Sequence, residues 1–187
     1  MGRFNRIFGV FLILCLWGVN EILAQSYLSR NGYVEFLSEA PQEDVLGKSN
    51  FLVGRISLTD NEVDFYVDAR TLKTGITYRD EHLQENYIET DKFPYAEFFG
   101  SFTEKPDPSS EEVQDVKVEG NFKVHGVENP VTIIGTVQFL KNGNLYIKAN
   151  WPLQLSDYDI PIPKVLNYRL SNDLTLTVDI ILEKRSQ

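Results

Sequence analysis

Strict alternation between apolar and polar residues recurs along the chain and restricts its possible folds more than any other feature. The pattern is clearest at residues 63–68, 116–124, 145–155 and 174–183. Successive side chains of a β-strand point to opposite faces, so each segment predicts a strand with one apolar and one polar face. Such strands must pair with one another and bury their apolar faces together.

Four further segments predict strands with less regular alternation. They lie at residues 33–38, 51–57, 95–102 and 131–140. Their β-branched and aromatic residues favour extended structure. The chain is therefore expected to contain about eight strands.

Turn residues lie between these segments. Asp60-Asn61 and the run 141–144 (Lys-Asn-Gly-Asn) contain Asn and Gly, which adopt the positive φ angles of tight hairpins. Residues 126–130 mark another corner, and the acidic stretch 104–115 predicts a solvated loop. Only residues 79–87 are typical of a helix, and they predict a short connection. Because tight hairpin turns join consecutive strands, neighbouring strands are expected to be antiparallel.

About eight antiparallel strands with one apolar face each form either a sandwich or a closed barrel. Closure removes exposed edge strands. The interior of a barrel of about eight strands is either filled by side chains or holds one small ligand. Alternation identifies the dry face but does not distinguish a hollow barrel from a filled one.

The N-terminus has the order of a secretory signal peptide. Arg3 and Arg6 precede the apolar run 7–19, and the small residue Ala24 follows it. The run is shorter than the about 20 residues of a membrane-spanning helix. We therefore predict a signal peptide at residues 1–24 and an exported domain at residues 25–187, periplasmic or extracellular, without a membrane span. An uncleaved N-terminal anchor is the alternative.

Cysteine and charge exclude several classes of function. The single cysteine, Cys15, lies in the predicted signal peptide, and Leu14 before it argues against a lipoprotein signal. The exported domain would then have neither a disulfide nor a thiol nucleophile. The net charge of -9 is unlike that of proteins that bind nucleic acids or anionic membranes.

The inward-facing candidates of the predicted strands contain no charged residue. They would line a tunnel for an apolar ligand, or they would pack against one another in a solid core. These candidates are Phe65, Val67, Val118, Phe122, Ile133, Val137, Phe139, Ile147, Trp151, Leu153, Leu176, Val178 and Ile180.

A cluster of polar residues lies near the predicted helix. Arg79, Asp80 and His82 have side chains used in catalysis or metal binding. The structural interpretation is that Asp80 caps the helix, His82 bonds locally and Leu83 plugs the barrel. A third hypothesis places Arg79 or His82 at the cavity mouth, where a charge-assisted hydrogen bond would hold the ligand's polar head. Tyr168 is a further candidate for the mouth.

Metal and enzyme chemistry have no support in the sequence. Two histidines without cysteines do not supply the about four ligands of a structural zinc site. The sequence contains neither a glycine-rich phosphate loop nor a nucleophile elbow. We therefore expect no metal, no cofactor and no enzymatic activity.

Three groups of residues, in this order, resemble the YceI-like family of periplasmic polyisoprenoid-binding proteins. The resemblance covers residues 33–182. In the third group Asp159 replaces the glycine that is usual in the family. The groups are Leu72, Thr74-Gly75, Arg79-Asp80, His82-Leu83, Phe93-Pro94, Ala96 and Phe98; Val118, Gly120, His125-Gly126-Val127 and Pro130-Val131; and Asp157-Tyr158-Asp159-Ile160-Pro161.

This resemblance implies an all-β fold, an extended eight-stranded antiparallel lipocalin-like barrel with one short connecting helix. It also implies a long apolar ligand inside the barrel, either a polyprenyl lipid or an isoprenoid quinone. One alternative is a solid β-domain that acts as an envelope interaction or stress-related structural protein. A lipid-modifying enzyme is another alternative, and it would need an acid or base that faces the interior.

Overall fold

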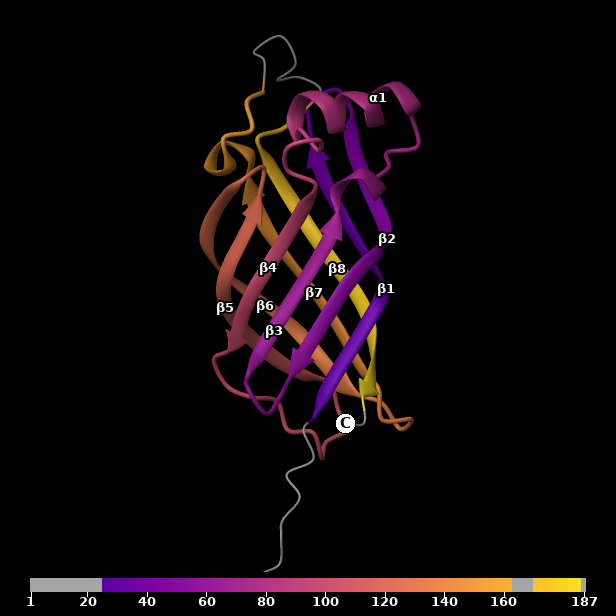
Figure 1. The fold of residues 1–187 in the computed structure, drawn as a ribbon, viewed down its shortest axis with the longest axis vertical. Helices are drawn as coiled ribbons and strands as arrows, with labels where there is room; N and C mark the ends of the chain where they lie inside the picture. The colour runs from indigo at the N-terminus through magenta and orange to yellow at the C-terminus, as the bar shows by residue number, and fades with distance from the viewer. Residues whose placement is uncertain (1–24, 163–169, 186–187) are drawn as a thin grey trace, which may run out of the picture.

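The computed structural model describes residues 25–162 and 170–185, and its strands form one closed antiparallel barrel (Figure 1). Each strand pairs with its neighbours in the chain, and β8 pairs with β1 to close the barrel. The predicted fold class is confirmed. The strands are β1 (Ser26–Glu39), β2 (Asp44–Ser57), β3 (Glu62–Asp68), β4 (Tyr95–Phe102), β5 (Gln114–Val124), β6 (Val127–Phe139), β7 (Leu145–Gln154) and β8 (Asp173–Arg185).

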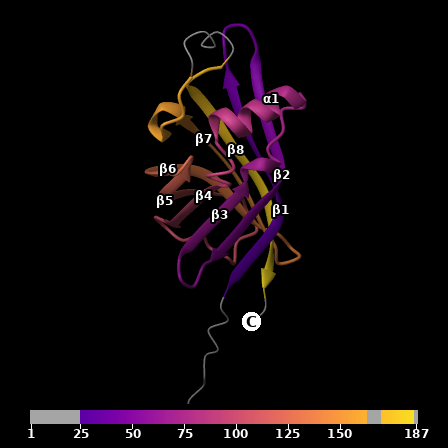
Figure 2. The same ribbon diagram turned by 45° about the horizontal axis from the view of Figure 1, so that its top comes forward.

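Short helices gather at one end of the barrel, which we call the helical end (Figure 2). Three of them connect β3 to β4: the 3-10 helix η1 (Ala69–Thr71), the α-helix α1 (Thr77–His82) and the π-helical turn η2 (Leu83–Tyr87). The 3-10 helix η3 (Leu155–Tyr158) follows β7. The predicted helical connection is present and begins at Thr77. None of the helices in the described residues is long and apolar enough to cross a membrane.

The opposite end carries the β2–β3, β4–β5 and β6–β7 connections, and we call it the hairpin end (Figure 1). Two of its turns have the predicted backbone, because Asn61 and Gly143 have φ values of 61° and 84°. The start of β1 and the end of β8 also lie here. The described chain therefore enters and leaves the barrel at the end opposite the helices.

Strands β1 and β2 begin well before the predicted segments 33–38 and 51–57. The missed part of β1 contains two register shifts against β2, between Ser29 and Gly32 and between Gly32 and Val34. A bulge inserts an extra residue, so inward and outward positions no longer alternate strictly. This irregularity hid the first half of β1 from sequence analysis.

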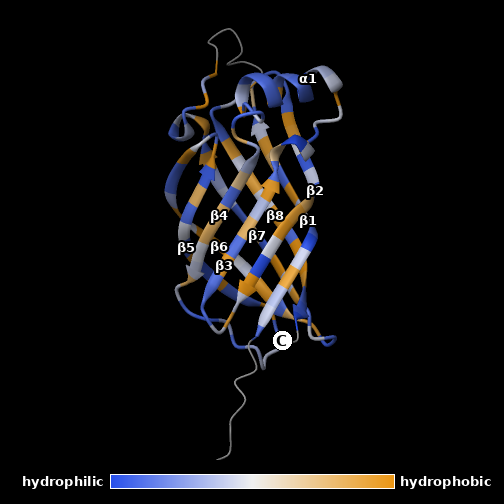
Figure 3. Ribbon diagram, in the orientation of Figure 1, coloured by the Kyte–Doolittle hydropathy of each residue, from blue (hydrophilic) through white to orange (hydrophobic). Residues whose placement is uncertain are grey.

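The apolar faces of the strands meet inside the barrel, and the strands alternate along their length in hydropathy (Figure 3). On β8, Leu174, Val178 and Leu182 are buried and face inward. Inside the hairpin end, Leu145 and Leu182 are both 0% exposed. The core is thus one continuous apolar interior that runs the length of the barrel.

Candidate functional site

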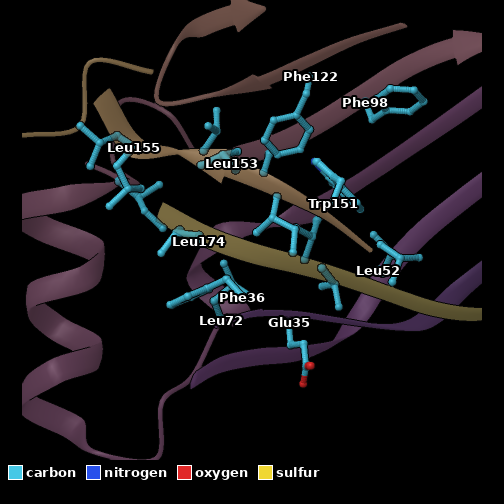
Figure 4. A pocket seen from close by; sticks show the side chains of 18 of the residues that line it. Glu35, Phe36, Leu52, Leu72, Phe98, Phe122, Trp151, Leu153, Leu155 and Leu174 are labelled. Atoms are coloured by element: carbon cyan, nitrogen blue, oxygen red, sulfur yellow. The ribbon is translucent and has the colours of Figure 1, made fainter. Parts of the chain in front are cut away.

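Two apolar cavities lie inside the barrel. The larger, of about 130 Å³, lies toward the helical end, and we call it the upper cavity (Figure 4). The smaller, of about 70 Å³, lies nearer the hairpin end, and we call it the lower cavity. Concave apolar spaces of this kind are the usual binding sites for small ligands. The upper cavity is the main candidate site.

Helices and loops of the helical end close the upper cavity. Leu83 and Tyr87 of η2 line it, and both pack against the core. Leu155 of η3 and Ile160 after it line the same space and are buried. Leu83 therefore lies at the end of the barrel interior, where a side chain that plugs the barrel would lie. These residues lie over the cavity at the helical end, and we call them the lid.

Glu35 of β1 is the only charged residue among the described residues that line either cavity. Its carboxylate points away from the neighbouring apolar side chains (Figure 4). It accepts a hydrogen bond from the Tyr33 hydroxyl, and this bond, with burial and the nearby charge, raises the pKa of Tyr33 to about 12. No described lining residue presents a charged group to the cavity.

Four residues line both cavities and separate them; we call them the waist. They are Phe65, Phe98, Trp151 and Val178. Phe65 on β3 lies opposite Phe98 on β4, so two rings stand side by side in the wall. A Cβ on Gly120 would lie only 2.9 Å from the Phe98 ring. The ring therefore occupies the space that a side chain at position 120 would need. The waist thus depends on large rings packed over small residues.

Most of the predicted interior residues lie around these cavities. Phe139 and Ile180 are the exceptions. Whether the others contact a ligand stays a prediction. The residues that line the upper cavity, the lower cavity or both are Phe65, Val67, Val118, Phe122, Ile133, Val137, Ile147, Trp151, Leu153, Leu176 and Val178.

Phe139 and Ile180 were predicted to line the cavity, but neither is among the residues that line the upper or the lower cavity. Both are buried, but in the solid packing toward the hairpin end. The Phe139 ring lies 6.1 Å from that of Tyr27, and Ile180 packs over Gly32. Alternation reports the face of a strand, but it does not report the level along the barrel axis at which a residue packs.

Sequence reasoning also missed several lining residues. Phe98 lies in a predicted strand and faces inward, so its alternation with Glu97 was an available signal. Leu72 and Ile88 come from the connection between β3 and β4. For these two only the fold decides the position, because no periodic pattern marks which loop residues turn inward.

The residues predicted to meet a polar head group are not among the described lining of either cavity. The Arg79 guanidinium binds the carboxylate of Glu43, with 3.0 Å between Nη2 and Oε2. The His82 ring lies 4.3 Å from the Tyr78 ring, and its Nδ1 lies 3.4 Å from the Asn86 amide nitrogen. Both side chains make local contacts on the helical end. Tyr168, the third candidate, lies outside the described residues, as does the predicted signal peptide at residues 1–24.

Asp80 fixes the loop before α1. Its buried carboxylate accepts hydrogen bonds from the backbone N–H and the hydroxyl of Thr74, at 2.6 Å and 2.7 Å. The N-cap residue of α1 is Ile76, which makes no side-chain cap bond. Asp80 therefore has a structural role, but it does not cap the helix as expected. Residues 25–162 and 170–185 contain no cluster of three or more potential metal ligands.

His125 connects three segments of the helical end. It lies in the β5–β6 turn with φ of 53°, its Nδ1 lies 3.0 Å from the Tyr158 carbonyl oxygen, and its Nε2 lies 2.9 Å from Glu89 Oε2. The hydrogen bonds from Lys92 and then from His125 lower the pKa of Glu89. The sequence marked His125 only as part of a motif, because its partners are distant in the chain.

The fold and the cavity together define the class of this protein: a small closed antiparallel β-barrel whose described lining encloses an apolar pocket. The model of the YceI-like domain matches residues 30–182. The chain therefore belongs to the YceI-like family. A comparison with curated proteins found no match.

Several solved structures share this fold. A polyisoprenoid binding domain from Saccharophagus degradans is 20% identical, with a TM-score of 0.74 over 87% of this chain and 99% of that chain. Burkholderia cenocepacia BcnA is 11% identical, with a TM-score of 0.64 over 81% of this chain and 96% of that chain. The Campylobacter jejuni YceI protein is 14% identical, with a TM-score of 0.55 over 100% and 92% of the two chains. At these identities the likeness concerns the fold.

Proposed function

We propose that the protein binds a long apolar isoprenoid lipid, either a polyprenyl chain or an isoprenoid quinone, inside its barrel. The observation that carries this proposal is the upper cavity, whose described lining presents no charged group and which a lid covers. The similar Saccharophagus degradans domain is described as polyisoprenoid binding. The protein would sequester or carry this lipid after export to the periplasm or the cell exterior.

Binding would rest on shape and on the removal of apolar surface from water. Each square ångström of apolar surface buried contributes about 25 cal/mol, and each methylene group about 0.8 kcal/mol. A cavity of about 150 Å³ holds one benzene molecule. The upper cavity, at about 130 Å³, therefore has room for about one isoprene unit. A longer chain must also use the lower cavity or displace part of the lid.

A binding role agrees better with this cavity than catalysis does. Acid-base catalysis needs an ionisable group within hydrogen-bond reach of the reacting atoms. Glu35, the charged residue among the described lining, directs its carboxylate away from the upper cavity (Figure 4). We therefore propose a carrier or sequestering protein and no enzymatic reaction.

The first test is native mass spectrometry of the protein purified from its own cell envelope, followed by organic extraction. We expect one isoprenoid molecule per chain, identified in the extract. A protein that carries no lipid and takes up neither polyprenols nor quinones would contradict the proposal. It would favour the solid β-domain that acts through its surface.

A variant that fills the cavity provides the second test. Ala96 on β4 lines the upper cavity, so Ala96→Phe places a phenyl ring there. The neighbouring Glu97 is 47% exposed and pairs with Lys123 on the outer face, so Glu97→Phe adds the same ring outside. We expect Ala96→Phe to reduce retained lipid at least tenfold and Glu97→Phe to leave it unchanged. Equal retention in both folded variants would count against the cavity as the site.

A further inference from the structure

The indole N–H of Trp151 is a buried donor with no hydrogen-bond partner among the described residues. The residue is only 9% exposed. Buried tryptophan N–H groups usually find a partner, and an exception needs an explanation. Trp151 lines both cavities, so this unpartnered donor lies in the waist between them.

Several aromatic residues line the cavities together with Trp151. The Phe122 ring lies 6.0 Å from the Trp151 ring at an interplanar angle of 77° (Figure 4). Phe65 and Phe98 complete the aromatic part of the waist. A planar ligand ring would find favourable contacts here because aromatic rings favour offset and edge-to-face arrangements. The waist thus combines aromatic side chains with one polar donor.

We propose that Trp151 is the specificity-determining residue of the cavity and that its N–H donates to a carbonyl oxygen of an isoprenoid quinone. This inference rests on the proposed function and deepens it. The quinone ring then lies at the waist, deep in the barrel. This orientation differs from the hypothesis in which Arg79 or His82 holds the head group at the mouth.

Complementarity favours a carbonyl over the other head groups of isoprenoid lipids. A phosphate would bring negative charge into a cavity whose described lining offers no cation. A prenol hydroxyl would bring a donor of its own that needs a second partner. A quinone carbonyl only accepts, so it satisfies the Trp151 N–H and adds no unpaired donor.

The test compares two probes, decylubiquinone, which carries carbonyl groups, and squalene, an isoprenoid without oxygen. The chain has two tryptophans, Trp17 and Trp151, so an NMR spectrum shows at most two indole N–H signals. The signal that disappears in Trp151→Phe belongs to Trp151. We expect decylubiquinone to shift this proton signal downfield and squalene to leave it within a small fraction of that shift.

Affinity provides a second measurement. Trp151→Phe keeps an aromatic ring and removes the donor, so we expect it to weaken decylubiquinone binding about five- to tenfold. Its effect on squalene should stay below about twofold. As a control, Phe98→Leu changes the waist without removing a donor, and it should weaken both probes to a similar extent.

Different outcomes separate this inference from the proposed function. If the wild type binds both probes and Trp151→Phe weakens them equally, the hydrogen bond to the quinone is absent and the inference is overturned. An indole signal that does not move on quinone binding would overturn the inference in the same way. If the wild type binds neither probe, the lipid-binding function fails and this inference fails with it.

Discussion

The two ends of the barrel have interiors built from the same kinds of side chain, but the larger cavity lies toward the helical end, whereas the hairpin end encloses only the smaller one and its outermost layer of side chains is fully buried. On the single strand β8, Leu182 toward the hairpin end is 0% exposed, whereas Leu174 toward the helical end lines the upper cavity. Tyr27, Leu58 and Phe139 fill the space near the hairpins. The helical end is covered by lid residues that lie above the interior. Because the strands carry the same kinds of side chain at both ends, the segments that close each end determine where the larger cavity remains.

Two leucine truncations on β8 test this difference and have the largest expected effects. Leu182→Ala should lower the free energy of unfolding by about 4 kcal/mol, because it opens a cavity in close packing. Leu174→Ala should lower it by only about 2 kcal/mol, because that side chain already lacks neighbours on its cavity side. Urea unfolding measures both values. Equal losses would show that the helical end is packed as tightly as the hairpin end.

The carboxylate of Glu89 should make the helical end sensitive to acid. The hydrogen bonds from Lys92 and His125 lower its pKa in the folded state below the ordinary value of 4.5. A lowered carboxyl pKa stabilises the fold fully above the unfolded value, and this contribution is lost as the pH falls through the folded-state pKa. The difference in unfolding free energy between wild type and Glu89→Gln should therefore be largest near neutral pH and shrink below about pH 4.5.

The control for this experiment is Glu85→Gln. Glu85 lies exposed on η2, four residues before Glu89, so it tests the removal of a nearby charge. Urea unfolding at several pH values gives the comparison. A pH dependence that is the same in Glu89→Gln and in wild type would show that the contact between Glu89 and His125 does not stabilise the helical end.

The smallest effect is expected for Arg79. Its ion pair with Glu43 joins the helical connection to the β1–β2 turn, and the Glu43 side chain is 44% exposed. Exposed ion pairs contribute at most about 1 kcal/mol. Arg79→Ala should therefore change the free energy of unfolding by less than about 1 kcal/mol and leave lipid retention unchanged. A folded Arg79→Ala protein that loses its lipid would restore the hypothesis of a charged site at the mouth.

Much of the fold could be predicted because regular strands carry a local signal. Strand β4 has the predicted bounds, Tyr95–Phe102, and the turns at Asn61 and Gly143 have the expected backbone. The signal failed where bulges interrupt β1 before Val34. It also failed for Leu72 and Ile88, which reach the cavity from a connection without periodicity.

The candidate site could be predicted only in part. Alternation identified Phe65 and Trp151 as inward-facing, and both lie at the waist. It also placed Phe139 in the cavity wall, although this ring packs against Tyr27 near the hairpin end. Sequence proximity suggested a role for Arg79 at the mouth, whereas its guanidinium binds Glu43 on the outside.

The alternation of apolar and polar residues was enough to predict an all-β chain whose inward faces are apolar, because the side-chain direction of a strand repeats every two residues. The sequence also showed that the chain has only two histidines and one cysteine for metal or thiol chemistry. The three-dimensional arrangement was needed to show which inward positions surround empty space, which loop residues form the lid and that the Trp151 N–H has no hydrogen-bond partner among the described residues. Those properties depend on how segments far apart in the sequence meet across the barrel. Local periodicity reports only the face of a strand, so it does not predict these contacts.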